Sequence, residues 1–169
     1  MRRTTATVAL LSSLLIGCSA LVRPALPFVP SDAVRGVLTD WQAAGLSCGE
    51  PQVGMPGPAI DWVCRGPLAG VEVNGRLIAD RFGVQSIHLG VPAATPGATA
   101  AAAFAALVRA TSLVDAAEPE IRSWLIATAA AEGTMPTSDA IPRVHISPDV
   151  DGSPVLYLVP HGSSMLLAE

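Results

Sequence analysis

Apolar side chains recur at helical spacing directly after Ser31, a residue type that favours the N-cap position of a helix. Asp32 falls in the first turn, where a negative charge interacts favourably with the helix dipole, and Gly45 is a stop signal. We therefore expect a helix between these residues, with its apolar side in the core. The apolar positions are Val34, Val37, Leu38 and Trp41.

Alternating apolar and polar side chains predict three consecutive strands after this helix. The first covers residues 60–65, and the third covers residues 84–91 with Ser86 and His88 directed outward. The second covers residues 71–80, and its alternation passes through Asn74-Gly75 without a change of phase. Although Asn-Gly is a strong hairpin signal, an unbroken phase favours one long strand with a bulge or bend at that point. The turn then falls at residues 80–83.

The second half of the chain predicts two helices followed by a hairpin. Helical spacing of apolar residues covers residues 97–112 and 117–131, and residues 142–147 and 154–160 have strand character around a turn at residues 149–153. The order of elements predicts an α+β fold. We expect an antiparallel sheet of about five strands, packed by the N-terminal helix and the central helix pair.

Three tryptophans occupy apolar positions of different predicted elements: Trp41, Trp62 and Trp124. We expect them in the core where the helices meet the sheet. The alternative is a pocket between helices and sheet that admits a small apolar ligand or an acyl chain.

The N-terminus combines a basic start, Met1-Arg2-Arg3, with an uncharged apolar stretch that ends in Leu15-Ile16-Gly17-Cys18. The stretch is shorter than the about 20 residues that a membrane-spanning helix needs, which favours a cleaved signal peptide. This arrangement resembles a bacterial lipoprotein signal. The resemblance implies that the Cys18 thiol carries diacylglycerol and that the chain is cut before Cys18; a plain secretory signal is the alternative.

This resemblance divides the chain into four parts. Residues 1–17 are the signal peptide, and residues 18–30 form a lipid-anchored tether with Pro24, Pro27 and Pro30. Residues 31–161 form a single domain, and residues 162–169 a tail. The implied location is outside the cytoplasm, on the cell membrane or the outer membrane, and the implied partner is the membrane itself, through the N-terminal lipid. Ser19, rather than Asp, follows Cys18 and favours the outer membrane where the host has one.

The charge of the chain argues against nucleic acid as a partner. All ten basic residues are arginines, and removal of Arg2 and Arg3 with the signal leaves eight arginines against fourteen acidic residues. An acidic surface without a basic cluster is unsuited to binding phosphate backbones or anionic lipids. The absence of lysine, together with abundant Ala, Gly, Pro and Arg, is typical of a GC-rich genome.

With Cys18 assigned to lipid, Cys48 and Cys64 remain as an even pair. In an oxidising compartment such a pair predicts a disulfide, which would close a loop rich in Gly and Pro. The chain-entropy model gives such a bond about 3 kcal/mol of stabilisation. A redox pair is the alternative, although the spacing is far from Cys-x-x-Cys.

Residues that carry chemistry in other proteins occur here without a complete motif, so we expect no catalytic, cofactor or metal site. The turn at Asp149–Ser153 resembles part of a calcium loop, but its glycine is misplaced and no glutamate follows. The histidines are His88, His145 and His161, and the first two approach each other if both face outward on one sheet. The acids Asp61, Glu72 and Asp80 fall on the polar side of predicted strands, where solvation accounts for them.

These features favour a non-enzymatic binding or interaction module of the cell envelope, with an envelope protein or a small apolar molecule as possible ligands. A carrier of a lipid or small apolar molecule is the first alternative. The second is an envelope hydrolase that uses His88 or His145 with a nearby acid or serine. The layout around Cys48, Trp62-x-Cys64 and Arg122-Ser123-Trp124-Leu125 also resembles small lipoproteins of GC-rich bacteria, a resemblance that implies no activity.

Overall fold

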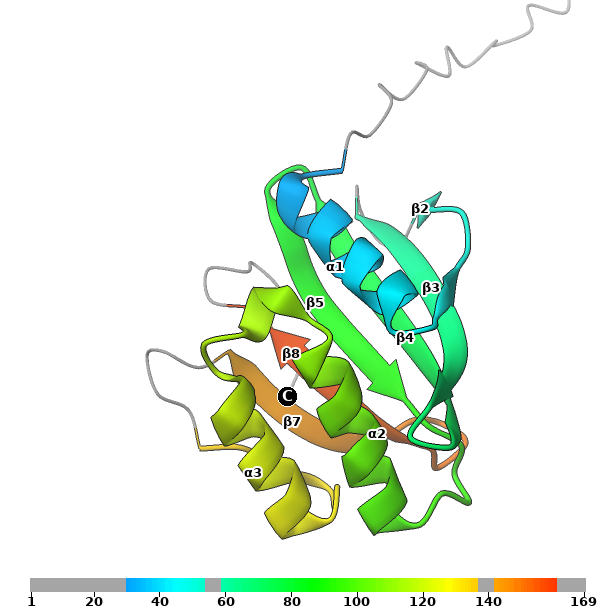
Figure 1. Ribbon diagram of the computed structural model, residues 1–169, viewed down its shortest axis with the longest axis vertical. Coiled ribbons are helices and arrows are strands. Elements are labelled where there is room, and N and C mark those ends of the chain that lie inside the picture. Colours follow the sequence, from blue (N-terminus) through cyan, green and yellow to red (C-terminus); the bar gives the residue numbers. More distant parts are fainter. Residues whose placement is uncertain (1–29, 54–58, 137–141, 161–169) are drawn as a thin grey trace, which may run out of the picture.

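One antiparallel sheet runs through the protein and carries the helices on one of its faces (Figure 1). The computed structural model describes residues 30–53, 59–136 and 142–160. Its helices are α1 (Asp32–Ala43), α2 (Gly97–Arg109) and α3 (Glu118–Thr128), with a 3₁₀ turn, η1 (Ser112–Val114), after α2. Its strands are β1 (Ser47–Cys48), β2 (Gln52–Val53), β3 (Ile60–Leu68), β4 (Val71–Asp80), β5 (Gly83–Gly90), β6 (Gly133–Thr134), β7 (Arg143–Pro148) and β8 (Pro154–Val159).

The strand order is β1-β3-β4-β5-β8-β7-β6, and β2 also pairs with β3. The predicted α+β class is confirmed, and the five predicted strands correspond to β3, β4, β5, β7 and β8. The sheet is larger than expected because it includes three further strands, β1, β2 and β6. Each of these strands contains only two residues. A strand this short has no alternation from which a sequence pattern can be recognised.

The first helix begins and ends where its sequence indicates. The hydroxyl oxygen of Ser31 accepts a hydrogen bond from the backbone N–H of Val34 at 3.3 Å, and Gly45 follows the helix with φ of +100°. The apolar side chains of Val34, Val37 and Trp41 are fully buried. This helix is therefore held to the sheet by its apolar side, as its spacing predicts.

The face of the sheet toward the helices is lined by apolar side chains that lie opposite one another on neighbouring strands. Such cross-strand neighbours pack together, and burial of each large side chain stabilises the fold by about 1.5–3 kcal/mol. One row across the sheet consists of Trp62, Leu77, Ile87, Leu158 and Val144. A second consists of Cys64, Gly75, Leu89, Leu156 and Ile146.

Two of the three tryptophans are in this core as predicted: Trp41 is fully buried and Trp62 is 4% exposed. Trp124 is only partly buried and packs against the edge of the core. The helix pair ends earlier than expected, at Arg109 and Thr128. After Thr128 the backbone of Ala129 enters the left-handed region with φ of 51°, which stops the helix.

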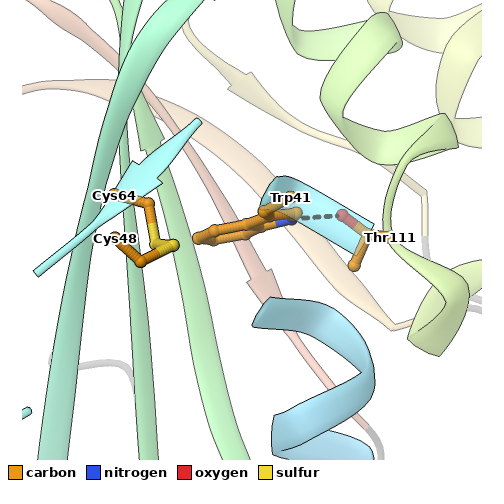
Figure 2. The surroundings of a disulfide bond; sticks show 4 residues. All are labelled: Trp41, Cys48, Cys64 and Thr111. Carbon is orange, nitrogen blue, oxygen red and sulfur yellow. Dashed lines mark hydrogen bonds between the residues drawn. A yellow bond between two sulfur atoms is a disulfide. The ribbon is translucent and has the colours of Figure 1, made fainter. Parts of the chain in front are cut away.

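Asn74-Gly75 lies inside the continuous strand β4, and its glycine accommodates a tryptophan. A Cβ atom at position 75 would lie 2.8 Å from Cζ3 of Trp41, so the indole packs directly on the backbone of the strand. The indole N–H of Trp41 donates a hydrogen bond to Oγ1 of Thr111 at 3.0 Å (Figure 2). The predicted bulge at Asn74-Gly75 is wrong: the pairing shifts between Ile78 and Ala79 instead.

Cys48 and Cys64 form the predicted disulfide. The two residues are direct partners in the β1–β3 pairing, with their Cα atoms 3.9 Å apart. Figure 2 shows the bond beside the indole of Trp41, on the side away from Thr111. The disulfide therefore fastens the short strand that follows α1 to the long strand β3.

The predicted signal peptide, almost all of the tether and the tail lie outside the described residues. The described helices contain 11 to 13 residues. None of them has the length and apolar character required to cross a bilayer.

The substitution Gly75→Ala should destabilise the protein by about 2 kcal/mol, because the added methyl group overpacks the contact with Trp41. Urea denaturation followed by tryptophan fluorescence measures this change. Gly133→Ala is the matched control, since a Cβ atom there meets nothing within 4 Å. Equal stability of the two variants would contradict the packing contact.

Candidate functional site

The face of the sheet opposite the helices carries a row of polar and aromatic side chains at its centre. Arg76 of β4 lies opposite His88 of β5, His88 opposite Tyr157 of β8, and Tyr157 opposite His145 of β7. Because directly opposed residues of antiparallel strands project from the same face, the four side chains stand side by side. We call these four residues the polar row.

The three rings of the polar row are in contact. The rings of His145 and Tyr157 are stacked, with centroids 4.5 Å apart and planes 4° from parallel. The rings of His88 and Tyr157 are 4.7 Å apart and tilted by 56°. Both are favourable distances for aromatic pairs, and together they hold Tyr157 between two imidazoles.

Arg76 is held at the end of the polar row by a buried carboxylate. Its Nε atom donates a hydrogen bond to Oδ2 of Asp61 at 2.8 Å, and its Nη2 atom donates to the same oxygen. The predicted solvation of Asp61 is wrong, because this residue is only 6% exposed and its charge is compensated by Arg76. Glu72 is exposed as expected, whereas Asp80 accepts hydrogen bonds from Phe82 N–H and Gln85 Nε2.

Ser86 lies next to His88 but is closed to solvent. Its Oγ atom is 3.0 Å from Nε2 of His88, yet Ser86 is fully buried. Both residues lie on the predicted outward face of β5, although only His88 is partly exposed. A serine nucleophile must reach its substrate, so this pair orients the imidazole of His88 rather than forming a hydrolytic centre.

The two histidines of the polar row are neutral at pH 7. Burial, followed by the positive charge of Arg76 and the interaction with His145, lowers the pKa of His88 to about 4, and the negative charge of Asp149 opposes this shift. Burial also lowers the pKa of His145. The row therefore presents two uncharged imidazoles beside the ion pair of Arg76 and Asp61.

A groove of about 570 Å³ begins at the polar row and extends toward the β7–β8 turn. A second set of cross-strand partners, Arg65, Asn74, Gly90 and Val155, crosses its floor. Gly90 has no side chain, and this leaves the middle of the floor low. The other end of the same face is closed, since Ile78, Ser86 and Val159 are buried.

Charges of both signs line the groove. Arg65 and Arg76 lie on β3 and β4, whereas Asp149 and Asp151 lie on the β7–β8 turn and Glu72 lies on β4. Within the described part of the chain, neither Arg65 nor Glu72 forms an ion pair. Hydrogen bonding from Ser153 lowers the pKa of Asp151, which keeps this carboxylate ionised. The groove thus offers, on one strand, a guanidinium that has no ion-pair partner among the described residues, and it has carboxylates nearby.

The segment from Asp149 to Ser153 forms the hairpin turn that joins β7 and β8. Asp149 N–H donates to the carbonyl of Ser153 at 2.8 Å, and Gly152 adopts φ of +79°. Among the described residues, no three His, Cys, Asp or Glu side chains are grouped so that they could hold a metal ion. His161 lies outside the described residues.

The layer between helices and sheet is filled by large side chains. Trp41, Phe104, Leu107 and Leu125 are all fully buried there. A smaller groove of about 330 Å³ lies between α2 and α3 and is lined mainly by alanines. This packing lends no support to the predicted alternative of an apolar ligand between helices and sheet.

From the sequence, His88 and His145 approach each other only if both face outward on one sheet, and the structure places them on either side of Tyr157. Tyr157, Arg76 and Arg65 were not among the predicted site residues. The alternation of β3 and β4 does place Arg65 and Arg76 on the same face. Only the order of the strands brings Tyr157 between the histidines.

Comparisons with family models, curated proteins and solved structures find no match for this chain. The fold and the groove therefore define it only as an α+β domain with a polar groove on its open sheet face.

Lowering the pH from 7 to 5 should destabilise the protein by about 2 kcal/mol through His88. In the unfolded chain His88 has a pKa near 6.5 and is protonated at pH 5. In the folded protein its pKa is about 4, so it remains neutral at pH 5. Acid therefore favours the unfolded state. Urea denaturation at several pH values measures the effect. His88→Asn should reduce this pH dependence, and an unchanged slope would show that His88 is not its source.

Proposed function

We propose that this protein is a lipid-anchored, non-enzymatic binding module of the cell envelope, and that its groove binds a small polar ligand carrying charges of both signs. The observation that supports this most directly is the groove of about 570 Å³ on the open sheet face, with charged residues around it. Grooves of this size are in the range typical of small-molecule sites.

The arrangement of charges favours an amphoteric ligand over a purely anionic one. Arg65 has no carboxylate partner among the described residues and can pair with an anionic group of a ligand. Asp149 and Asp151, on the turn at the other side, can pair with a cationic group. A ligand that carried only negative charge would meet these carboxylates and be repelled.

A binding role accounts for the chemistry of the groove better than a hydrolytic one. The serine beside His88 is fully buried. The imidazole of His88 is engaged with that serine and has a pKa far below 7, which makes it a weak general base. Hydrogen-bonding side chains such as Asn74 and Tyr157 line the groove and can orient a bound molecule.

The proposed anchor depends on the sequence Leu15-Ile16-Gly17-Cys18. Processing before Cys18 leaves a thioether-linked diacylglycerol on that residue, and two or more acyl chains give stable membrane attachment. The disulfide between Cys48 and Cys64 is consistent with an oxidising compartment.

Intact-mass spectrometry of the native protein should identify a diacylated or triacylated N-terminus at Cys18. Replacement of this residue, Cys18→Ser, should abolish the lipid mass and release the protein from membranes. A mature chain that starts elsewhere and carries no lipid would contradict the anchor.

Alanylalanine with free termini is a suitable probe of the groove, because it carries one charge of each sign. NMR titration of the protein should show shifts at Arg65, His88 and Ser153, and Arg65→Gln should weaken binding about tenfold through loss of a charged hydrogen bond. Arg143→Gln is the matched control, since Arg143 lies on β7 outside the groove.

The same dipeptide with acetyl and amide caps should bind more weakly, since it lacks both charges. Myristate tests the alternative of an apolar carrier. Tighter binding of myristate than of the dipeptide, or equal binding of the capped and free dipeptides, would contradict the proposed ligand class.

A further inference from the structure

The groove and the point where the tether joins the domain lie at opposite ends of the sheet. At one end, the β4–β5 turn links Asp80 to Gly83, and the chain enters α1 beside it (Figure 1). At the other end are the β3–β4 turn and the β7–β8 turn, which borders the groove. We call the first of these the tether end.

The tether end presents an exposed aromatic ring on a well-defined turn. Phe82 is 77% exposed, and the guanidinium carbon of Arg81 lies 4.6 Å from the centroid of its ring. The backbone N–H of Phe82 donates to Oδ1 of Asp80 at 2.7 Å, and Gly83 adopts φ of +133°. The ring of Phe82 is therefore largely open to solvent at the tether end.

A second exposed apolar side chain belongs to the same end. Val53 of β2 is 74% exposed and lies opposite Ile60 of β3. Ile60 in turn lies opposite Ala79, next to the turn that carries Phe82. The described chain thus places two of its most exposed large apolar side chains at the end where the tether joins.

We infer that Phe82 and Arg81 form a membrane contact, with the lipid surface as the partner. This inference rests on the lipid anchor of the proposed function. Aromatic rings partition favourably into the interfacial region of a bilayer, and arginine places its guanidinium among the headgroup phosphates. Arg81 is free for such contact, because no ion pair engages it within the described ranges.

The tether makes this weak contact effective. From Cys18 to Pro30 the chain spans at most about 40 Å when fully extended, so the domain remains within reach of the bilayer. Because the anchor already holds the protein at the membrane, Phe82 meets the bilayer at a high effective concentration. Insertion of this one ring then suffices to bias the orientation of the domain relative to the membrane. In the resulting orientation the groove opens away from the membrane, toward soluble ligands.

Site-directed fluorescence on the lipidated protein tests this orientation. An environment-sensitive nitrobenzoxadiazole probe is attached through Phe82→Cys, and the protein is reconstituted in vesicles of the zwitterionic lipids phosphatidylethanolamine and phosphatidylcholine. Val150→Cys is the matched control, because Val150 is a fully exposed apolar residue on a hairpin turn at the opposite end. Spin-labelled lipids should quench the probe at position 82 about threefold more than the probe at position 150.

A second labelling position keeps the native ring in place. The probe attached through Val53→Cys should be quenched in the otherwise unchanged protein, and the added substitution Phe82→Ser should reduce that quenching. Equal quenching at positions 82 and 150, or stronger quenching at 150, would overturn the orientation. Since only lipidated protein is reconstituted, either result would leave the anchor itself intact.

Discussion

The contact between the indole of Trp41 and the backbone of Gly75 sets the geometry of this domain. It lets the indole of Trp41 pack directly on the backbone of β4, and a side chain at position 75 would collide with the indole. The hydrogen bond from the indole to Thr111 ties the same side chain to the segment between α2 and η1. One tryptophan thereby positions the first helix relative to the sheet and to the second helix at once.

The disulfide reinforces this arrangement from the side. Cys64 is the immediate cross-strand partner of Gly75, and Cys48 lies on β1, the next element after the helix that carries Trp41. The disulfide and the buried indole therefore lie side by side in the core (Figure 2), and Gly75 contacts the same indole. The packing between the helices and the sheet forms the core of the domain. The opposite face of the sheet can therefore carry polar side chains that contribute little to that core.

The position of the β-bulge decides which polar side chains meet on that face. Ala79 pairs with Val84 and Ile78 with Ser86, so Gln85 is the extra residue. If Gln85 paired with Ile78 instead, Arg76 would lie opposite Ile87 rather than His88. The bulge shifts the pairing by one residue between the turn at residues 80–83 and the polar row. Arg76 and His88 therefore project from the same face of the sheet. The groove beside that row lies at the end of the sheet opposite the point where the chain enters α1.

The sequence by itself determined the elements and the face that most side chains take. The structure confirms the helix after Ser31, the five long strands and the disulfide between Cys48 and Cys64. Each of these predictions depended on local spacing or on counting residues. Tertiary structure decided what Gly75 accommodates, why Asp61 is buried and which ring stands between His88 and His145. The physical reason is that spacing along one strand specifies a face, whereas the register between strands and the packing across layers depend on residues far apart in the chain.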